Sequence, residues 1–489
     1  MQTKILTSPQ SGCQALIYVL PKSEDLPVHL AEIADRSGIS SEVLHRDFTA
    51  DLKENHSFYT TSGQRIFLLG LGEKSDSNAV LQTCRSFVHH QKKLPAHIGI
   101  DLTFGAAEKY AVDVLTGFYL GNYNINFYQT SEKKTAPFAG ETASIDVIVE
   151  KKEAEQAKQA AERARKTADT LSNIFDLINR PANKKRPQDM AAFMVQSGKT
   201  CGYSVRVMEK AEIEKTGLHA LLAVNRGSED PARFVIMEYK PKHKKKVPKI
   251  GLVGKGVTFD TGGLSIKGSA NMHLMKSDMG GSGAVIGAME LVAKLKLPVY
   301  LVAVVGATDN SVDALSYKPS DVVNSYVGKT IEIIDTDAEG RLTLADGLAY
   351  VHKNYQPDIL IDIATLTGAV IRALGYAAAG LFTQNDELAR ELIRAGNETG
   401  EKVWQMPMWD DYKSMIKSDV ADVRNFSGKP IAGSITAAKF LEHFTEGHPK
   451  WAHLDIAGTS VTANEFATDR SATGFGVRLL LQFIENQIK

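Results

Sequence analysis

Hydrophobic and polar residues alternate along the chain in blocks that predict short buried strands separated by helices. Near the N-terminus, apolar runs of strand length occupy residues 65–73, 97–104 and 146–152. Runs of this kind, bounded by polar and glycine-containing stretches, are typical of strands in an α/β domain. We therefore expect a smaller N-terminal α/β domain over residues 1–152.

A long polar stretch follows this domain. Residues 153–179 are rich in Ala, Glu, Lys and Arg, contain no glycine or proline, and end just before Pro181. Strong helix formers without a breaker, stopped by a proline, predict a single helix. We expect this helix to connect two domains.

The rest of the chain contains nearly continuous apolar runs, at 249–259, 299–308, 329–336 and 358–370. Strands that are covered by helices on both faces have this pattern, because neither face meets water. The pattern predicts a larger C-terminal α/β domain over residues 180–489, with a mixed central sheet flanked by helices. The lysine-rich run at 240–249 is expected to be a solvated turn.

Composition and charge narrow the class of protein. Of the 489 residues, 43% are hydrophobic, which is enough to fill a core in each of two domains. The 57 Lys and Arg residues balance 57 Asp and Glu residues, so the chain has no net charge to attract nucleic acid or an anionic membrane. Binding to nucleic acid or a membrane is therefore not expected.

The location of the protein follows from its cysteines and its apolar segments. Three widely spaced cysteines without a CxxC pair predict neither a disulfide framework nor a zinc ribbon, and they favour a reducing compartment. The first residues lack the pattern of a signal peptide, and no apolar window reaches the length of about 18 residues that spans a bilayer. We expect a soluble, cytoplasmic protein.

Common catalytic signatures are missing from the sequence. It contains no HExxH, GxSxG or GxxxxGK[ST] motif and no Cys/His zinc cluster. The segment GGSGAVIG at 280–287 resembles a dinucleotide-binding loop only faintly. Its glycines are better explained by close helix packing or a tight turn.

Polar residues gather instead at the ends of apolar runs in the C-terminal domain. Ligand sites in α/β sheets form at the carboxyl ends of strands, so these side chains are expected to meet in one crevice. Each of them alone has a structural explanation as a helix cap, a turn former or a surface charge. The candidates are Lys255, Asp260, Lys267, Asp278, Asp337, Glu339 and Arg341.

Four carboxylates brought together would repel one another unless cations lie among them. Two divalent metal ions sharing a water molecule resolve this conflict and form a centre for metal-assisted hydrolysis. Oxygen ligands without cysteine suit Zn, Mn, Mg or Co. Of Lys255 and Lys267, a deprotonated one can bind metal and a protonated one can polarise a substrate carbonyl, and the two lysines could divide these roles.

Several segments resemble the leucyl aminopeptidases, the dinuclear-metal cytosolic aminopeptidases of peptidase family M17. The similarity lies in VGKGVTFDTGGLSIK, MKSDMGG and above all TDAEGRL, whose order and spacing match throughout. Further matches are NRPANKKRPQDMA (179–191), ATLTGA (364–369), WAHLDIAGT (451–459) and ATGFGVRLL (472–480). The resemblance covers about the last 310 residues strongly, and the first 150 only by length and order.

The resemblance implies a metal-dependent aminopeptidase whose C-terminal domain is catalytic. By similarity, Asp260 and Glu339 bridge both metals and Asp337 completes the more exchangeable site. Lys255 and Asp278 complete the tighter site.

The resemblance also implies roles at the substrate. Lys267 would be the electrophile that faces the peptide carbonyl, and Arg341 would hold a bicarbonate ion acting as general base. Met275, Thr365 and Gly368 match positions of the pocket for the first side chain, which suits leucine-like residues. Met275 alone is equally well explained by core packing.

Peptides with a free N-terminus are the expected substrates, with broad apolar specificity, and a homohexamer is the expected assembly. One residue departs from the family pattern, because Asp335 stands where the family has Asn. Asp335 would either add charge near the metals or cap a turn, and we favour the turn. The alternative function is that of a dual-role or non-catalytic family member that binds DNA or protein.

Overall fold

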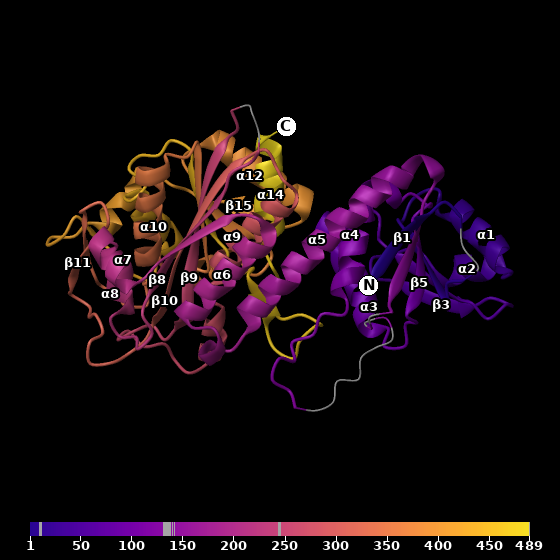
Figure 1. Cartoon of the computed structure of the whole chain (residues 1–489), viewed down its shortest axis with the longest axis horizontal. Helices are drawn as coiled ribbons and strands as arrows, with labels where there is room; N and C mark the ends of the chain where they lie inside the picture. Colours follow the sequence, from indigo (N-terminus) through magenta and orange to yellow (C-terminus); the bar gives the residue numbers. More distant parts are fainter. Residues whose placement is uncertain (9–11, 131–137, 139, 141, 243–245, 489) are drawn as a thin grey trace. The chain divides into compact units, whose positions relative to one another are not determined.

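The computed structural model describes residues 1–8, 12–130, 138, 140, 142–242 and 246–488. The chain forms two compact units, Met1–Ser172 and Asn173–Lys489. Helix α5 (Ala154–Asn179) runs from the first unit into the second, as the long helix predicted from the sequence (Figure 1). The boundary between the units falls inside this helix, and the domain limits at 152 and 180 stay a prediction.

A six-stranded sheet forms the centre of the first unit, in the order β1-β6-β5-β2-β4-β3. Its strands are β1 (Gln2–Leu6), β2 (Ala15–Leu20), β3 (Asn55–Tyr59), β4 (Arg65–Gly70), β5 (His97–Asp101) and β6 (Ser144–Ile148). Neighbouring strands are parallel except β3, which is antiparallel to β4. The three predicted strands are β4, β5 and β6, although β6 ends early and a 3₁₀ turn, η2 (Lys151–Glu153), follows.

Helices cover both faces of this sheet (Figure 1), which explains why the inner strands β2 and β4 are apolar and almost entirely buried. The edge strands β1 and β3 are partly exposed. Leu16 and Leu68 face a core with α1 (Leu26–Ser37) and α2 (Ser41–Asp47). Ile17 and Phe67 are their direct neighbours in sequence and point to the other face, where they join a second core with α3 (Ser77–His90) and α4 (Ala107–Leu120).

The second unit is built on a mixed, eight-stranded sheet in the order β15-β14-β17-β13-β9-β10-β8-β7. The central strands β17, β13, β9 and β10 are parallel, and β14, β8 and β7 are antiparallel to neighbours. The strands are β7 (Ser204–Met208), β8 (Arg233–Tyr239), β9 (Lys249–Asp260), β10 (Tyr300–Asn310), β13 (Ile359–Ala364), β14 (Ala379–Phe382), β15 (Val403–Gln405) and β17 (Trp451–Asp455).

Helices flank both faces of this sheet as well. On one face α8, α10 and α13 contribute to a core with Val253 of β9, and on the other α9 packs against the neighbouring Gly254. Helix α6 packs beside α9, and α14 lies between α9 and α12. The helices are α6 (Pro187–Cys201), α7 (Lys210–Thr216), α8 (His219–Asn225), α9 (Gly280–Lys294), α10 (Gly340–Tyr355), α11 (Gly368–Leu374), α12 (Asp386–Thr399), α13 (Gly433–Glu442) and α14 (Val477–Gln487).

Short elements complete this unit. They are the strands β11 (Val322–Asn324), β12 (Thr330–Glu332), β16 (Val423–Arg424), β18 (Val461–Thr462) and β19 (Ser471–Ala472), and the 3₁₀ segments η3 (Ala182–Lys184), η4 (Met272–Ser277) and η5 (Asp410–Ile416). Among the described residues, no helix is both long and apolar enough to cross a bilayer. The lysine-rich run at 240–249 lies partly outside the described residues.

The prediction for the apolar run at 329–336 is wrong in one respect. The run supplies only β12, which belongs to a small sheet with β11 and β16 instead of the central sheet. Along β12 only Ile331 is buried, between half-exposed Thr330 and Glu332. One buried face is typical of a peripheral strand and does not support burial between two helix layers.

The glycines at 280–287 belong to helix α9 and do not form a loop. A Cβ atom added at Gly281 would lie 2.8 Å from the carbonyl carbon of Ile363 in β13. Glycine is therefore required there because the helix backbone packs directly on the sheet, as the helix-packing interpretation predicted.

Candidate functional site

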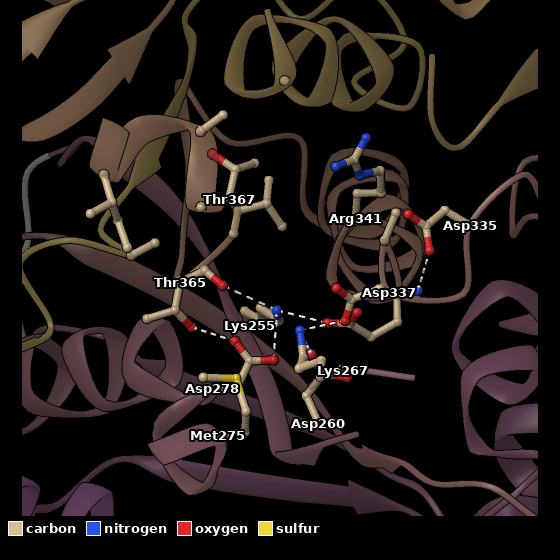
Figure 2. A pocket seen from close by; sticks show the side chains of 18 of the residues that line it. Lys255, Asp260, Lys267, Met275, Asp278, Asp335, Asp337, Arg341, Thr365 and Thr367 are labelled. Carbon is tan, nitrogen blue, oxygen red and sulfur yellow. Dashed lines mark hydrogen bonds and ion pairs between the residues drawn. The ribbon is translucent and has the colours of Figure 1, made fainter. Parts of the chain in front are cut away.

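All ten site residues predicted from the sequence line one cavity of the second unit, with a volume of about 500 Å³. They are Lys255, Asp260, Lys267, Met275, Asp278, Asp337, Glu339, Arg341, Thr365 and Gly368. The cavity lies beyond the carboxyl ends of the parallel strands β9 and β13, which is where open α/β sheets bind ligands. Figure 2 shows most of these side chains pointing toward one another.

Strand β9 carries two of the charged residues, and a β-bulge places them on the same face. Lys255 lies inside the strand and Asp260 is its last residue. Val257 of β9 pairs with Thr308 of β10, and the next pair is Asp260 with Asn310. Between these two pairs, β9 has two residues where β10 has one, so β9 contains one extra residue. Without this residue, Lys255 and Asp260 would point to opposite faces of the sheet.

The loop after β9 brings Lys267 back to the strand end. Gly262 and Gly263 have φ angles of 89° and 63°, a region that favours glycine. A Cβ atom at Gly262 would also lie 3.0 Å from Oδ1 of Asp337. The two glycines therefore allow the loop to turn tightly beside the carboxylates.

The DTDAEGRL segment forms the turn that enters α10. The Asp335 carboxylate accepts a hydrogen bond from the backbone N–H of Asp337 at 2.9 Å, so Asp335 caps the turn (Figure 2). Glu339 is the N-cap residue of α10. The next residue is Gly340, where a Cβ atom would lie 2.6 Å from the Lys255 amine, so a side chain there would displace the lysine.

Two further segments close the cavity. Met275 belongs to η4, and Asp278 is the first residue after η4, just before α9 begins. Thr365 follows β13, and its hydroxyl donates a hydrogen bond to Asp278 Oδ1 at 2.8 Å. Gly368 begins α11, whose N-cap residue is Thr367.

Each of the two lysines pairs with two carboxylates of the cluster, and Figure 2 shows both lysines beside Asp260, Asp278 and Asp337. Lys255 Nζ lies 2.7 Å from Asp278 Oδ2 and 2.8 Å from Glu339 Oε1, and it donates a hydrogen bond to the Thr365 carbonyl at 3.1 Å. Lys267 Nζ lies 2.8 Å from Asp260 Oδ2 and also pairs with Asp337. Lys255, Asp260, Asp278 and Glu339 are all less than one-tenth exposed.

These residues fit a divalent metal centre. Asp260, Asp337 and Glu339 each offer an oxygen atom, and the three atoms lie within 4.8 Å of one another. Glu339 Oε2 is buried and has no hydrogen-bond partner among the described residues. If all four carboxylates of the cluster are ionised, two lysines leave two negative charges uncompensated in a buried site, a charge that divalent cations would neutralise.

Burial and mutual repulsion shift the proton affinity of these groups. Burial and the Asp260 carboxylate raise the pKa of Asp337 to about 7, against the opposing effect of Lys267. Burial also raises the pKa of Asp278, and Lys255 offsets only part of that effect. Burial alone would lower the pKa of both lysines, but the surrounding carboxylates outweigh it and raise both values above normal. In the absence of metal, both lysines are therefore ammonium ions.

Arg341 supplies a separate cationic point in the cavity. Its Nη1 atom donates a hydrogen bond to the Asn425 carbonyl at 2.6 Å. Its buried Nε atom has no hydrogen-bond partner in the part of the chain that the structure describes. Burial lowers the pKa of Arg341 to about 10, although nearby Glu339 opposes this effect. Arg341 thus stays charged at neutral pH and has donor capacity left for a small anion.

Three residues that were not predicted from the sequence hold this site in place. Asn310, the last residue of β10, donates to Asp260 Oδ1 at 2.8 Å. Asp455, the last residue of β17, accepts hydrogen bonds from Leu366 N and Thr367 Oγ1, which fixes the loop after Thr365. Asn425 binds Arg341 through its carbonyl. Asn310 and Asp455 are polar residues that end apolar strands, so the rule that selected Asp260 could have selected them.

Comparison with known proteins gives one family. The model described as "Cytosol aminopeptidase family, catalytic domain" matches residues 174–481. A probable cytosol aminopeptidase of Chlorobium limicola is 43% identical over 504 residues, covering 99% of both chains. A probable cytosol aminopeptidase of Chloroherpeton thalassium is 41% identical over 495 residues, covering 96% of both chains.

Among solved structures, the bottromycin maturation enzyme BotP in complex with Mn is similar over the whole chain. It has a TM-score of 0.84 and 29% sequence identity, and the match covers 98% of this chain and 100% of BotP. A second structure of BotP matches with a TM-score of 0.82 at the same identity, covering 97% of this chain and 99% of BotP. The similarity therefore includes both the N-terminal and the C-terminal unit.

Proposed function

The chain belongs to the cytosol aminopeptidase family, peptidase family M17, and we propose that it removes N-terminal residues, preferably leucine-like or otherwise apolar, from peptides. The observation that carries this proposal is the convergence of Asp260, Asp337 and Glu339 beside two lysines in one cavity. The relatives from Chlorobium limicola and Chloroherpeton thalassium are both named as probable cytosol aminopeptidases. A structure of the similar enzyme BotP has been solved in complex with Mn.

Five residues would hold two divalent metal ions, with Mn or Zn as the preferred candidates and Mg or Co as further possibilities. Asp260 and Glu339 would contact both ions, Asp337 would complete one site, and Lys255 with Asp278 would complete the other. Bound ions of this kind supply Lewis acidity that polarises a carbonyl and activates water near neutral pH. To serve as a ligand, Lys255 must lose the proton that it holds in the ion pairs with Asp278 and Glu339.

Lys267 would act on the peptide carbonyl. Its side chain is one-fifth exposed, more than that of Lys255, and it lines the cavity. A protonated amine at this position would donate a hydrogen bond to the carbonyl oxygen and stabilise the negative charge that develops there. The raised pKa of Lys267, caused mainly by the Asp260 carboxylate against the opposing effect of burial, keeps this proton in place.

Arg341 would bind bicarbonate, the group expected to serve as general base. The buried Nε atom without a partner and the anchored Nη1 atom suit a small oxyanion. This assignment would explain why the cavity needs no histidine, since no side chain of the protein has to take the proton from water.

The residues Met275, Thr365 and Gly368 would form the wall of the first side-chain pocket. A flexible methionine and a glycine without a side chain in this wall would leave room for branched or linear apolar side chains. Apolar pockets discriminate by only about 1–3 kcal/mol per methylene, so we expect broad specificity with a preference for leucine-like residues. The cytoplasm and a homohexamer remain the expected location and assembly.

The test is hydrolysis of leucine p-nitroanilide by the purified protein. We expect activity that a chelator removes and that Mn²⁺ or Zn²⁺ restores. Lys267→Met should reduce kcat strongly in the metal-loaded enzyme, whereas Lys353→Met, on the exposed side of α10 and away from the cavity, should not. A metal-loaded, folded protein that is inert on every N-terminal residue would reject the proposal.

A further inference from the structure

Three cationic side chains that the proposed mechanism does not use line the same cavity as the metal-site residues. They are Arg372, Lys429 and Arg470. In the described part of the chain, none of the three has a side-chain nitrogen within 4.0 Å of a carboxylate oxygen, so none forms an ion pair. No carboxylate of the described residues therefore neutralises these three charges at the cavity.

One of these side chains is held in place by a neighbour, and a second lies beside a residue of the cavity wall. Arg470 donates a hydrogen bond to the Tyr376 hydroxyl at 2.8 Å, and its guanidinium lies 5.0 Å from the centre of the Tyr376 ring. Arg372 follows Gly368 by one turn of α11, and its Nη1 atom lies 3.9 Å from the position of a Cβ atom on Gly368. Arg372 thus lies next to the first side-chain pocket that the proposed function assigns.

Lys429 comes from a third segment, the turn before α13. The Ser427 hydroxyl accepts a hydrogen bond from the Lys429 N–H at 3.2 Å and donates one to the Lys429 carbonyl at 3.1 Å, which holds the backbone of the turn. Three cations, one from helix α11 and two from loops, therefore line one cavity. A cluster of one sign beside a low-dielectric wall attracts and orients anions.

The size of the cavity indicates which anion this is. A volume of about 500 Å³ is within the range of pockets for drug-sized ligands, and so matches a di- or tripeptide. If the N-terminal residue of a substrate lies at the metal cluster, the C-terminus of so short a peptide lies one or two residues away, or about 3.5 Å per residue along an extended chain. Its carboxylate would then lie within the same cavity, where guanidinium groups can bind it in a bidentate manner.

We propose that Arg372, Lys429 and Arg470 form a binding subsite for a substrate carboxylate, and that the enzyme therefore favours di- and tripeptides with a free C-terminus. This inference rests on the proposed aminopeptidase function and names the substrate class of that site. An acidic side chain in the substrate would present the same chemistry, so the experiment separates these two sources.

The experiment compares kcat/KM of the Mn²⁺-loaded, full-length enzyme on Leu-Gly and on Leu-Gly-NH₂, which lacks the carboxylate. The ratio of the two values is measured for the wild type and for Arg372→Gln, Lys429→Gln and Arg470→Gln. We expect the wild type to prefer Leu-Gly, and each arginine variant to reduce the ratio about threefold to fivefold, as for partly exposed charge pairs. Raising the salt concentration should reduce the wild-type ratio as well.

Two controls make the result specific. Arg390→Gln removes an exposed arginine of α12 that does not line the cavity, and should leave the ratio at the wild-type value. Leu-Asp-NH₂ and Asp-Gly-NH₂ carry a side-chain carboxylate but no terminal one. A charge-dependent preference for either of these over Leu-Gly would contradict the assignment to the C-terminus.

The outcomes separate this inference from the function on which it rests. If all peptides are cleaved and the ratio stays the same in every variant, the carboxylate subsite is wrong and the aminopeptidase proposal stands. If the metal-loaded enzyme cleaves no peptide at all, both are wrong. Arg372 and Lys429 are exposed, so their replacement with Gln tests charge without disturbing the core.

Discussion

Replacing Gly281 with alanine should destabilise the second unit, because α9 and β13 are in backbone contact at this point. The added Cβ atom would lie 2.8 Å from the carbonyl carbon of Ile363 and 3.0 Å from Cα of Ala364, and still closer to the Ile363 oxygen. Backbone atoms of a central strand cannot rotate away, so the helix must move. Overpacking of this kind costs typically 1–3 kcal/mol, and the better helix propensity of alanine returns about 1 kcal/mol.

Gly283→Ala provides a matched control in the same helix. There the added atom would meet side-chain atoms only, Cδ1 of Ile178 at 3.0 Å and Cγ2 of Ile174 at 3.2 Å. Side-chain ends can shift by a few tenths of an ångström, so the gain in helix propensity roughly offsets the cost. We expect Gly281→Ala to unfold more easily than Gly283→Ala, by ~1 kcal/mol.

Tryptophan fluorescence during urea unfolding measures this difference selectively. The chain has 3 tryptophans, and Trp404, Trp409 and Trp451 all belong to the second unit. The signal therefore reports unfolding of the unit that carries the site. Equal unfolding midpoints for the two variants would refute the argument that direct backbone contact requires glycine at position 281.

Further predictions concern pH, metal binding and the anion. Burial raises the pKa of Asp346 from 3.8 to about 7, so the folded state favours the protonated carboxyl. The stability that this group contributes is therefore complete below about pH 4 and is lost as the pH rises to about 7. The stability of wild type relative to Asp346→Asn should therefore fall between pH 5 and pH 7.5 in urea unfolding, and a constant difference would contradict it. Asp335→Asn should change Mn²⁺ affinity less than a few-fold in calorimetry, since Asn can also accept the hydrogen bond from Asp337; a larger change would show that the Asp335 charge acts on the metals. Removing bicarbonate from the buffer should lower kcat of wild type but not of Arg341→Met, and the same loss in both would exclude Arg341 as the anion's binding site.

The fold class could be predicted because both sheets are covered on two faces, which leaves long apolar runs in the sequence. The run at 329–336 shows where this signal fails. Ile331, Ile333 and Ile334 are apolar enough to suggest a central strand, yet β12 is short and half-exposed in a peripheral sheet. Hydrophobicity reports burial, and the identity of the partner strands depends on contacts between distant segments.

The charged members of the site could be predicted because carboxylates and lysines are unusual next to apolar strands. Their arrangement could not. The bulge that puts Lys255 and Asp260 on one face depends on an extra residue relative to β10, which no local pattern reveals. The supporting roles of Asp455 and Asn425 depend on hydrogen bonds that span 89 and 84 residues of sequence. The cations Arg372 and Arg470 look like ordinary surface charges in the sequence.

Stoichiometric metal binding tests the central claim most directly. Protein stripped of metal with a chelator is titrated with Mn²⁺ in a calorimeter, and activity on leucine p-nitroanilide is followed in parallel. We predict saturable binding of two ions per chain, with activity rising as the sites fill, and a loss of at least one site in Glu339→Gln, since that carboxylate would contact both ions. Absence of saturable Mn²⁺ or Zn²⁺ binding, or full activity in the stripped protein, would contradict the account.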